Sequence, residues 1–481
     1  METGMEGDIE KVRLAIQEVL KGYDLASLLR ETGGAAAPPS RPGIFRDLDA
    51  AVSAAHRAQT ELVALPLGQR KLIVDAMRRT VLDNNEALSR EAVGETGLGN
   101  VGDKMIKNRL AALKTPGPED LETSAWSDEN GLCIMERAPY GVLGAITPCT
   151  NPIATICSNG IGMIAAGNSV VFNVHPAAKR TSVNLTAMIN ESIMRAGGPA
   201  NLLVALDEPT IESADRLMHH PGVNLLVITG GPAVVKAAMG SGKRAICAGP
   251  GNPPCVVDET ADLARAGASI AQGAGFDHNI VCICEKEILA VASIADRLKD
   301  ELKRNGAFEL NSEQARALTA LVIAVPGGPG REGSANKKFV GKSPRELGKA
   351  IGIDVPAGTR ILLCEAQRND PLVWTEQLMP YIPLVRMNSA DEAIDFAVEV
   401  EQGFRHSAMI HSRDIERLSR MARVMNCSLF VKNGPCYAGL GEGGAGYSSF
   451  TIASPTGEGV TRARNFTRER RCTLVDSFRI I

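Results

Sequence analysis

The chain has 481 residues, of which 44% are hydrophobic and 22% charged, and its formal net charge is -3. Because domains usually hold about 100 to 200 residues, we expect two to four domains, and the near-neutral charge argues against a nucleic-acid-binding surface. Eleven scattered cysteines, and the lack of any apolar run near ~18 residues, exclude a disulfide-rich secreted domain and a membrane span, which predicts a cytoplasmic protein with reduced thiols.

Residues 8–22 predict an amphipathic helix near the N-terminus. Apolar side chains recur there at helical spacing, at Ile9, Val12, Ile16, Val19 and Leu20. The acidic residues of this segment do not follow the basic-then-apolar order of a signal peptide. Residues 32–43, TGGAAAPPSRPG, have the composition of a linker. The helix either folds back on its own domain or docks on a partner, and the linker favours docking.

The body of the chain alternates strand and helix patterns. Helix-length segments such as 181–198 separate four predicted strands, at 141–147, 168–174, 200–206 and 223–230. A second series begins near Gly251, with strands at 252–258 and 285–291 around a helix at 261–275. Residues 465–480 alternate like an edge strand. This order predicts an α/β fold of βαβ units around parallel sheets, which bind ligands at the carboxyl ends of their strands.

Glycine pairs mark two turns between these elements. The segment ITGGPAVVKAAMG, 228–240, places a pair at a strand-to-helix turn, and AGPGNPP spans 248–254. Neither segment is a G-x-G-x-x-G motif. Each is therefore either a place where backbone approaches a ligand closely or a tight turn that needs positive φ.

Cys282 and Cys284 lie in GFDHNIVCICEKE, residues 275–287, in a predicted helix-to-strand loop. A buried core thiol is the commonest role for such residues. A metal site with His278 lacks a second Cys or His cluster, and a nucleophile is the third alternative. If the alternation of the following strand extends through this stretch, both thiols lie on one side, so spacing alone does not choose between them.

Six motifs occur in a fixed order along the chain: ITPCTNP, NSVVFNVHPAAK, AGPGNPP, GFDHNIVCICEKE, TEQLMPYIPLV and VKNGPCYAGLGEGG. Their order and spacing resemble the aldehyde dehydrogenase superfamily. The resemblance is specifically to its CoA-acylating branch, the propionaldehyde and acetaldehyde dehydrogenases of bacterial microcompartments. It covers residues 44–481, and several ordered motifs make it far more specific than any one of them alone.

The resemblance implies an aldehyde dehydrogenase-like fold. A Rossmann-like cofactor-binding domain would comprise residues 44–121 and 141–247, and an α/β catalytic domain residues 248–457. Residues 122–140 and 458–481 would form a small oligomerisation element that assembles dimers or tetramers. Residues 1–43 resemble an encapsulation-type helix and linker, which implies that 8–22 dock on shell or cargo proteins. The expected location is the cytoplasm, inside a bacterial microcompartment.

The resemblance also selects the nucleophile. The family's pattern of Phe-Asp-x-Asn, two residues and Cys matches Phe276, Asp277, Asn279 and Cys282, and Cys284 falls at a packing position. A Cys282 thiolate would attack the aldehyde carbon to give a thiohemiacetal. Hydride transfer to a nicotinamide would then leave an acyl thioester on Cys282.

The thiohemiacetal oxyanion needs hydrogen-bond donors. The superfamily draws them from the backbone N–H of the nucleophile and from a polar side chain in the loop that reads PCTNP here. Thr150 stands where hydrolytic relatives usually carry Asn, and Asn151 follows it. Both residues therefore stay candidate oxyanion donors.

The residue 34 positions before Cys282 is Ala248, where hydrolytic relatives carry the glutamate that activates water. Its absence implies thiolysis by CoA, with acyl-CoA as the product and ping-pong kinetics. The favoured substrate is propionaldehyde, with acetaldehyde as the alternative, since one methylene is worth only about 1 kcal/mol. Two other functions stay open: a hydrolytic aldehyde dehydrogenase, opposed by Ala248, and an inactive cargo or scaffold protein, opposed by the intact Cys282, Asn279 and Glu376.

Cofactor positions carry over from the same motifs. Glu376 in TEQLMP matches the glutamate that holds the nicotinamide ribose. Further positions that would line the dinucleotide are Pro148, Asn173, His175, Pro176, Thr229, Gly230 and Gly231. NAD is favoured over NADP because no basic residue is clearly placed for a 2′-phosphate, although Lys179 and Arg180 lie near in sequence. CoA would enter the same groove after NADH leaves.

His406 and His411, in GFRHSAMIHS, resemble a paired-histidine stretch that is common in the acylating branch. They either aid deprotonation of CoA or order the loop, and the structural role is favoured.

Overall fold

The computed structural model describes residues 41–476, 478 and 480. The predicted helix at 8–22 lies outside the described residues, as does most of the linker at 32–43. Residues 41–481 cluster as one unit. No helix in the described ranges is long and apolar enough to span a membrane.

A six-stranded parallel sheet contains the first series of predicted strands. Its order is β1-β6-β5-β4-β7-β8. The strands are β1 Ile44–Phe45, β4 Val142–Thr147, β5 Ser169–Val174, β6 Leu203–Leu206, β7 Leu225–Thr229 and β8 Ala245–Ala248. Both faces are covered, because Leu225 and Val227 of β7 pack in one core cluster and Leu226 and Ile228 in another. This two-sided burial explains why the strands read as continuous apolar runs.

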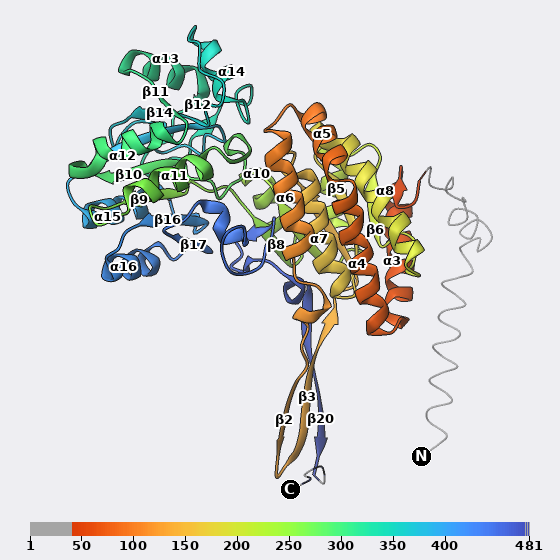
Figure 1. Cartoon of the computed structure of the whole chain (residues 1–481). Coiled ribbons are helices and arrows are strands. Elements are labelled where there is room, and N and C mark those ends of the chain that lie inside the picture. The colour runs from red at the N-terminus through yellow and green to blue at the C-terminus, as the bar shows by residue number, and fades with distance from the viewer. Residues whose placement is uncertain (1–40, 477, 479, 481) are drawn as a thin grey trace, which may run out of the picture. The chain divides into compact units, whose positions relative to one another are not determined.

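Helices cover both faces of this sheet (Figure 1). They are α3 Leu48–Ala64, α4 Leu67–Asp83, α5 Asn85–Thr96, α6 Val101–Lys114, α7 Pro152–Ala165, α8 Lys179–Arg195, α9 Ile211–His219 and α10 Pro232–Met239. Helix α7 is buried along its whole length and packs against α4, α6 and α8. It starts at Pro152, the last residue of PCTNP, so this loop is anchored by a helix that is buried along its whole length.

A second parallel sheet of seven strands has the order β11-β14-β15-β10-β9-β16-β17. The strands are β9 Pro254–Val257, β10 Glu287–Val291, β11 Ala307–Glu309, β14 Ile361–Glu365, β15 Tyr381–Met387, β16 Ser407–His411 and β17 Leu429–Lys432. Its helices are α11 Leu263–Ala274, α12 Ala292–Arg304, α13 Ser312–Val322, α14 Pro344–Ala350, α15 Ala390–Val400 and α16 Ile415–Met425. The predicted α/β fold with parallel sheets is confirmed.

Three antiparallel strands form a separate sheet: β2 Ser124–Asp128, β3 Gly131–Pro139 and β20 Thr467–Val475. Strand β20 runs along β3 from the Thr467–Pro139 pair to the Val475–Gly131 pair, so the predicted edge strand at 465–480 is present. Figure 1 shows this sheet extending as an arm away from the helices. Two short hairpins, β12 Ile323–Val325 with β13 Ser334–Ala335 and β18 Ile452–Ala453 with β19 Gly459–Val460, complete the strands.

Candidate active site

Cys282 lies in a sharply bent loop between helix α11 and strand β10. The loop opens with a short 3-10 turn, Phe276–Asn279, in which Asp277, His278 and Asn279 have φ of 46°, 52° and 63°. Left-handed backbone is costly for residues other than glycine and clusters at functional sites. The loop therefore has a conformation that the surrounding contacts must hold in place.

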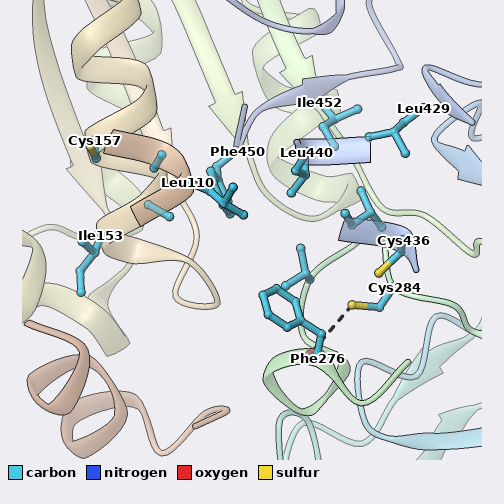
Figure 2. Packing of buried hydrophobic residues seen from close by; sticks show 14 of the residues in the cluster. Leu110, Ile153, Cys157, Phe276, Cys284, Leu429, Cys436, Leu440, Phe450 and Ile452 are labelled. Atoms are coloured by element: carbon cyan, nitrogen blue, oxygen red, sulfur yellow. Dashed lines mark hydrogen bonds between the residues drawn. The ribbon is translucent and has the colours of Figure 1, made fainter. Parts of the chain in front are cut away.

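The expectation that strand alternation places Cys282 and Cys284 on one side is wrong. Strand β10 begins only at Glu287, and both thiols lie in the preceding turn. Cys282 is partly exposed, whereas Cys284 is fully buried and donates from Sγ to the carbonyl of Phe276 at 3.8 Å. Figure 2 shows the sulfur of Cys284 among apolar side chains, joined by a dashed line to Phe276, with the sulfur of Cys436 nearby. Only Cys282 of this pair is open to a substrate.

The surroundings of Cys282 oppose its ionisation. Partial burial, and after it the nearby carboxylate of Glu376, raise the pKa of the Cys282 thiol to about 12, while the ammonium of Lys286 acts in the opposite direction. Lys286 is itself fully buried and donates to the backbone carbonyl of Asn279 at 3.0 Å and to its side-chain oxygen. Lys286 is therefore a buried cation that favours a thiolate at Cys282.

Asn279 holds the loop rather than facing a substrate. Its amide Nδ2 donates to the carbonyls of Ala274 at 2.8 Å and Glu285 at 3.0 Å, and its oxygen accepts from Lys286. His278 is tied down in the same way, with Nδ1 at 3.1 Å from the carbonyl of Gly341. Among the described residues no group of three or more His, Cys, Asp or Glu could hold a metal ion.

The candidate oxyanion loop joins β4 to α7. Thr150 is partly exposed and Asn151 is 9% exposed. Asn151 Nδ2 donates to Thr150 Oγ1 at 3.1 Å, and Lys107 Nζ donates to Asn151 Oδ1 at 2.5 Å. The two predicted donors are thus joined to each other and to a buried lysine of helix α6.

Ala248 ends strand β8, and Glu376 lies in the loop before β15, close enough to Cys282 to affect the pKa of its thiol. Ala248 is the last residue of β8 and 4% exposed, and its carbonyl accepts from Gly230 N–H at 3.3 Å. Glu376 Oε1 accepts from Gly251 N–H at 3.2 Å. Burial raises the pKa of Glu376 to about 7, against the lowering effects of Lys286 and this N–H group. The carboxylate is therefore held by backbone near Cys282, while position 248 offers only a methyl group.

The other predicted cofactor positions gather at one sheet edge. Pro148, Asn173, His175, Pro176, Thr229, Gly230 and Gly231 lie at or just after the carboxyl ends of β4, β5 and β7, which are neighbours in the sheet. Gly231 is the N-cap of α10, and a Cβ built there would meet nothing within 4 Å. Open space beside the free N–H groups of a helix start fits a pyrophosphate.

Two of these side chains are already paired within the protein. Asn173 Nδ2 donates to the carbonyl of Thr210 at 3.3 Å, and its Oδ1 accepts from Ser213 at 2.5 Å. Thr229 Oγ1 lies 2.8 Å from Thr451 Oγ1. His175 is exposed, and its Nδ1 accepts from the N–H two residues on. Backbone at this edge is therefore more open to a ligand than the Asn173 side chain.

His406 and His411 are both buried, and burial lowers the pKa of each to about 4. His406 Nδ1 lies 3.0 Å from Ser407 Oγ, and its ring packs on Gly251, where a Cβ would lie 2.8 Å from His406 Cγ. The Nε2 atoms of both rings have no hydrogen-bond partner in the described part of the chain. Neutral, packed imidazoles fit the structural role better than proton transfer to CoA.

Lys104 and Lys107 are site residues that sequence reasoning missed. Both are nearly inaccessible, and both contact the carboxylate of Asp277, with Lys104 Nζ at 3.1 Å. Their signal was present in the sequence, because the two lysines occupy the same helix stripe as the buried Leu110 and Ala111. A lysine on an apolar stripe is rarely fully buried unless it is paired.

Comparison with known proteins shows the family to which the chain belongs. The aldehyde dehydrogenase family matches residues 45–313. A propanal dehydrogenase (CoA-propanoylating) of Salmonella typhimurium is 45% identical over 92% of this chain and 94% of its own length. The acetaldehyde dehydrogenase (acetylating) EutE of the same organism is 46% identical over 97% of this chain and 99% of its own.

Solved structures show the same fold. A propionaldehyde dehydrogenase of Rhodopseudomonas palustris with bound CoA and an acylated cysteine has a TM-score of 0.88 at 49% identity, covering 91% of this chain and 99% of that one. An engineered glycolyl-CoA reductase with bound NADP⁺ gives the same score and identity, covering 91% and 99%. A propionaldehyde dehydrogenase from the fucose utilisation microcompartment of Clostridium phytofermentans also scores 0.88, at 46% identity over 92% and 100%. This chain belongs to the aldehyde dehydrogenase family.

Proposed function

We propose that this protein oxidises a short aliphatic aldehyde, propionaldehyde by preference, with NAD and transfers the acyl group to CoA. The observation that carries the proposal is that Cys282 is partly exposed while position 248, 34 residues before it, is an apolar alanine. The relatives named above as CoA-propanoylating or acetylating, and the one with bound CoA and an acylated cysteine, support the same chemistry.

Cys282 is the nucleophile in this mechanism. Its thiolate adds to the aldehyde carbon, and Lys286 stabilises the negative charge on sulfur before the attack. The oxyanion of the thiohemiacetal then accepts hydrogen bonds from the PCTNP loop, through Thr150 or Asn151, and from backbone N–H. A bound nicotinamide supplies the hydride acceptor, which leaves an acyl thioester on Cys282.

The fate of this thioester depends on position 248. A water molecule needs a general base to attack a thioester at neutral pH, whereas a thiol is a far better nucleophile. Ala248 offers no carboxylate, and Glu376 accepts its hydrogen bond from Gly251 N–H. We therefore assign the second half-reaction to the thiol of CoA, and the acyl-CoA product distinguishes this protein from a hydrolytic aldehyde dehydrogenase.

NAD is the preferred dinucleotide in this proposal. Lys179 and Arg180 follow the end of β5 and are the basic residues nearest in sequence to a 2′-phosphate site. Lys179 Nζ forms an ion pair with Glu208 at 2.7 Å, and Arg180 Nε lies 3.6 Å from Glu91. Both cations already have carboxylate partners, which weakens their attraction for a phosphate and favours NAD. The test is the ratio of kcat/KM for NAD to that for NADP, which we expect to exceed one.

The domain boundaries expected from sequence are part of the proposal. Residues 44–121 with 141–247 would bind the dinucleotide, and 248–457 would carry the nucleophile. Residues 122–140 with 458–481 contain the exposed arm, whose large apolar side chains Trp126, Leu474 and Val475 are 52%, 49% and 70% exposed. Exposed apolar groups gathered on one small sheet favour contact with another subunit. We propose a homo-oligomer, to be measured as mass in solution.

Encapsulation in a microcompartment is proposed for residues 8–22. A relative with the same fold comes from such a compartment, and the apolar stripe of this segment suits a docking face. The double variant Val12→Glu, Ile16→Glu should keep its catalytic rate and lose co-purification with shells. Loss of catalysis in that variant would contradict the proposal.

The decisive experiment measures NADH formation from propionaldehyde and NAD, with and without CoA, and identifies the product by mass. We expect CoA-dependent turnover to propionyl-CoA that Cys282→Ala abolishes. The matched control is Cys284→Ala, which removes the buried thiol two residues away and should retain turnover. CoA-independent formation of propionate would show that the protein is hydrolytic instead.

A further inference from the structure

Lys107 joins the two loops of the active site through one ammonium group. Its Nζ contacts Asp277 Oδ2 in the loop that carries Cys282, and Asn151 Oδ1 and the Thr150 carbonyl in the PCTNP loop. A lysine ammonium has three N–H donors, and here each has one acceptor. The side chain of Lys107 is 2% exposed, so water does not compete for these bonds.

The hydrogen bonds of the PCTNP loop run in one direction. Lys107 donates to Asn151 Oδ1 at 2.5 Å, and Asn151 Nδ2 donates to Thr150 Oγ1 at 3.1 Å. Thr150 Oγ1 accepts this bond, which leaves its own O–H group to donate. No acceptor for that O–H group is found among residues 41–476. Asn151 Nδ2 has a second N–H group that also lacks an acceptor within residues 41–476, but Asn151 is buried whereas Thr150 is partly exposed. The Thr150 hydroxyl, at the end of the chain of donors, is therefore the group more accessible to a ligand.

We propose that Thr150 is the side-chain oxyanion donor and that Lys107 is a positioning residue, which orients and polarises the Thr150 hydroxyl through Asn151. The proposal rests on the function proposed above and deepens it. A cation at one end of a hydrogen-bonded chain polarises each following bond, and this effect is strong where water is excluded. The donor is thus oriented before the oxyanion forms, as electrostatic stabilisation of a transition state requires.

Lys104 provides an internal comparison. It is also buried, lies one turn away on helix α6, and contacts both Asp277 Oδ2 at 3.1 Å and the Thr150 carbonyl at 3.4 Å. It makes no hydrogen bond to Asn151. Lys104→Met therefore removes a buried positive charge that pairs with the same carboxylate, that of Asp277. It leaves the hydrogen bonds from Lys107 through Asn151 to Thr150 in place.

The experiment measures the burst of NADH in the first turnover, with saturating aldehyde and NAD and without CoA. Removal of one oxyanion donor costs about 10²- to 10³-fold in rate, so Thr150→Val should lose that much and Thr150→Ser should recover most of it. Lys107→Met should lose at least ~10-fold and should be at least ~10-fold slower than Lys104→Met.

Two further readouts separate positioning from general damage. Alkylation of Cys282 by iodoacetamide does not use the oxyanion donor, so its rate in Lys107→Met should stay within about twofold of the wild type. Because the two residues act through one hydroxyl, Lys107→Met combined with Thr150→Val should be no slower than Thr150→Val alone.

The proposal is overturned if Lys107→Met equals Lys104→Met, if it lowers alkylation of Cys282 in parallel with the burst, or if the double variant loses the product of the two single losses. Failure of the proposed function would look different. The wild type itself would then show no burst, or would turn over to free acid without CoA.

Discussion

Asp277→Asn tests the charge balance beneath the active site. The carboxylate of Asp277 is fully buried and contacts both Lys104 and Lys107. Burial acts to raise the pKa of Asp277, but Lys107 and Lys104 lower it below the usual value, so the group is ionised. The variant keeps the shape and removes the charge, which leaves two buried ammonium groups without a counter-charge. Breaking a buried ion pair in this way costs about 3–5 kcal/mol of unfolding free energy.

The pH dependence of this loss has a definite sign. Burial and the neighbouring Lys107 lower the pKa of Lys104 to about 8, from 10.5 in the unfolded chain. Between these two values the unfolded state binds more protons, so stability rises with pH as Lys104 becomes neutral in the folded state. At pH 7 Lys104 is charged and needs the carboxylate of Asp277, whereas at pH 9.5 it is largely neutral and does not. The loss of stability caused by Asp277→Asn should therefore be large at pH 7 and smaller at pH 9.5.

The assay is urea unfolding of wild type and variant at both pH values, followed by the signal of the two tryptophans. Lys104→Met combined with Asp277→Asn serves as the control, because it removes one charge along with its partner and should recover part of the loss at pH 7. An equal loss at both pH values would refute the electrostatic argument. The destabilisation would then come from the hydrogen bond of Asn100 N–H to Asp277, which does not titrate.

Three further perturbations have defined outcomes. Ala248→Glu should produce propionate in the absence of CoA, detected by mass. If no propionate forms, a carboxylate at this position does not reach the thioester. Glu376→Gln should lower the pKa of Cys282 and speed its alkylation at pH 8 by roughly tenfold, because it removes the negative charge that raises this pKa; slower alkylation would contradict that cause. Gly99→Ala should destabilise by more than about 2 kcal/mol, since its φ is 69° and its Cβ would lie 1.9 Å from Asp277 Oδ1. Gly94→Ala is its matched control in a melting experiment, because the Cβ there meets nothing within 4 Å and helix propensity favours alanine.

The local pattern of apolar residues was sufficient to predict the strands of this protein. Continuous apolar runs at 168–174 and 223–230 predicted strands that the structure places at Ser169–Val174 and Leu225–Thr229. Such runs arise because helices cover both faces of a parallel sheet, and burial on both faces removes the polar alternation. The six ordered motifs then identified the family. Their order and spacing reflect the order of the strands and of the loops that follow them, which members of one family share.

Only the tertiary structure decided which groups in those loops can act. Cys282 and Cys284 are indistinguishable by spacing, yet the bend at Asp277–Asn279 leaves the first partly exposed and turns the second into the core. Thr150 and Asn151 are both candidate donors by sequence, and the hydrogen bonds from Lys107 through Asn151 to Thr150 favour the Thr150 hydroxyl that we propose.

The place of Lys107 on an apolar helix stripe indicated a buried, paired lysine, but its partner Asp277 is 170 positions away in sequence and could not be identified. The sequence by itself determined the elements, the family and the nucleophile loop, because those depend on short-range periodicity and on ordered motifs. The tertiary structure decided exposure, pairing and charge at the site, because these depend on contacts between segments that only folding brings together.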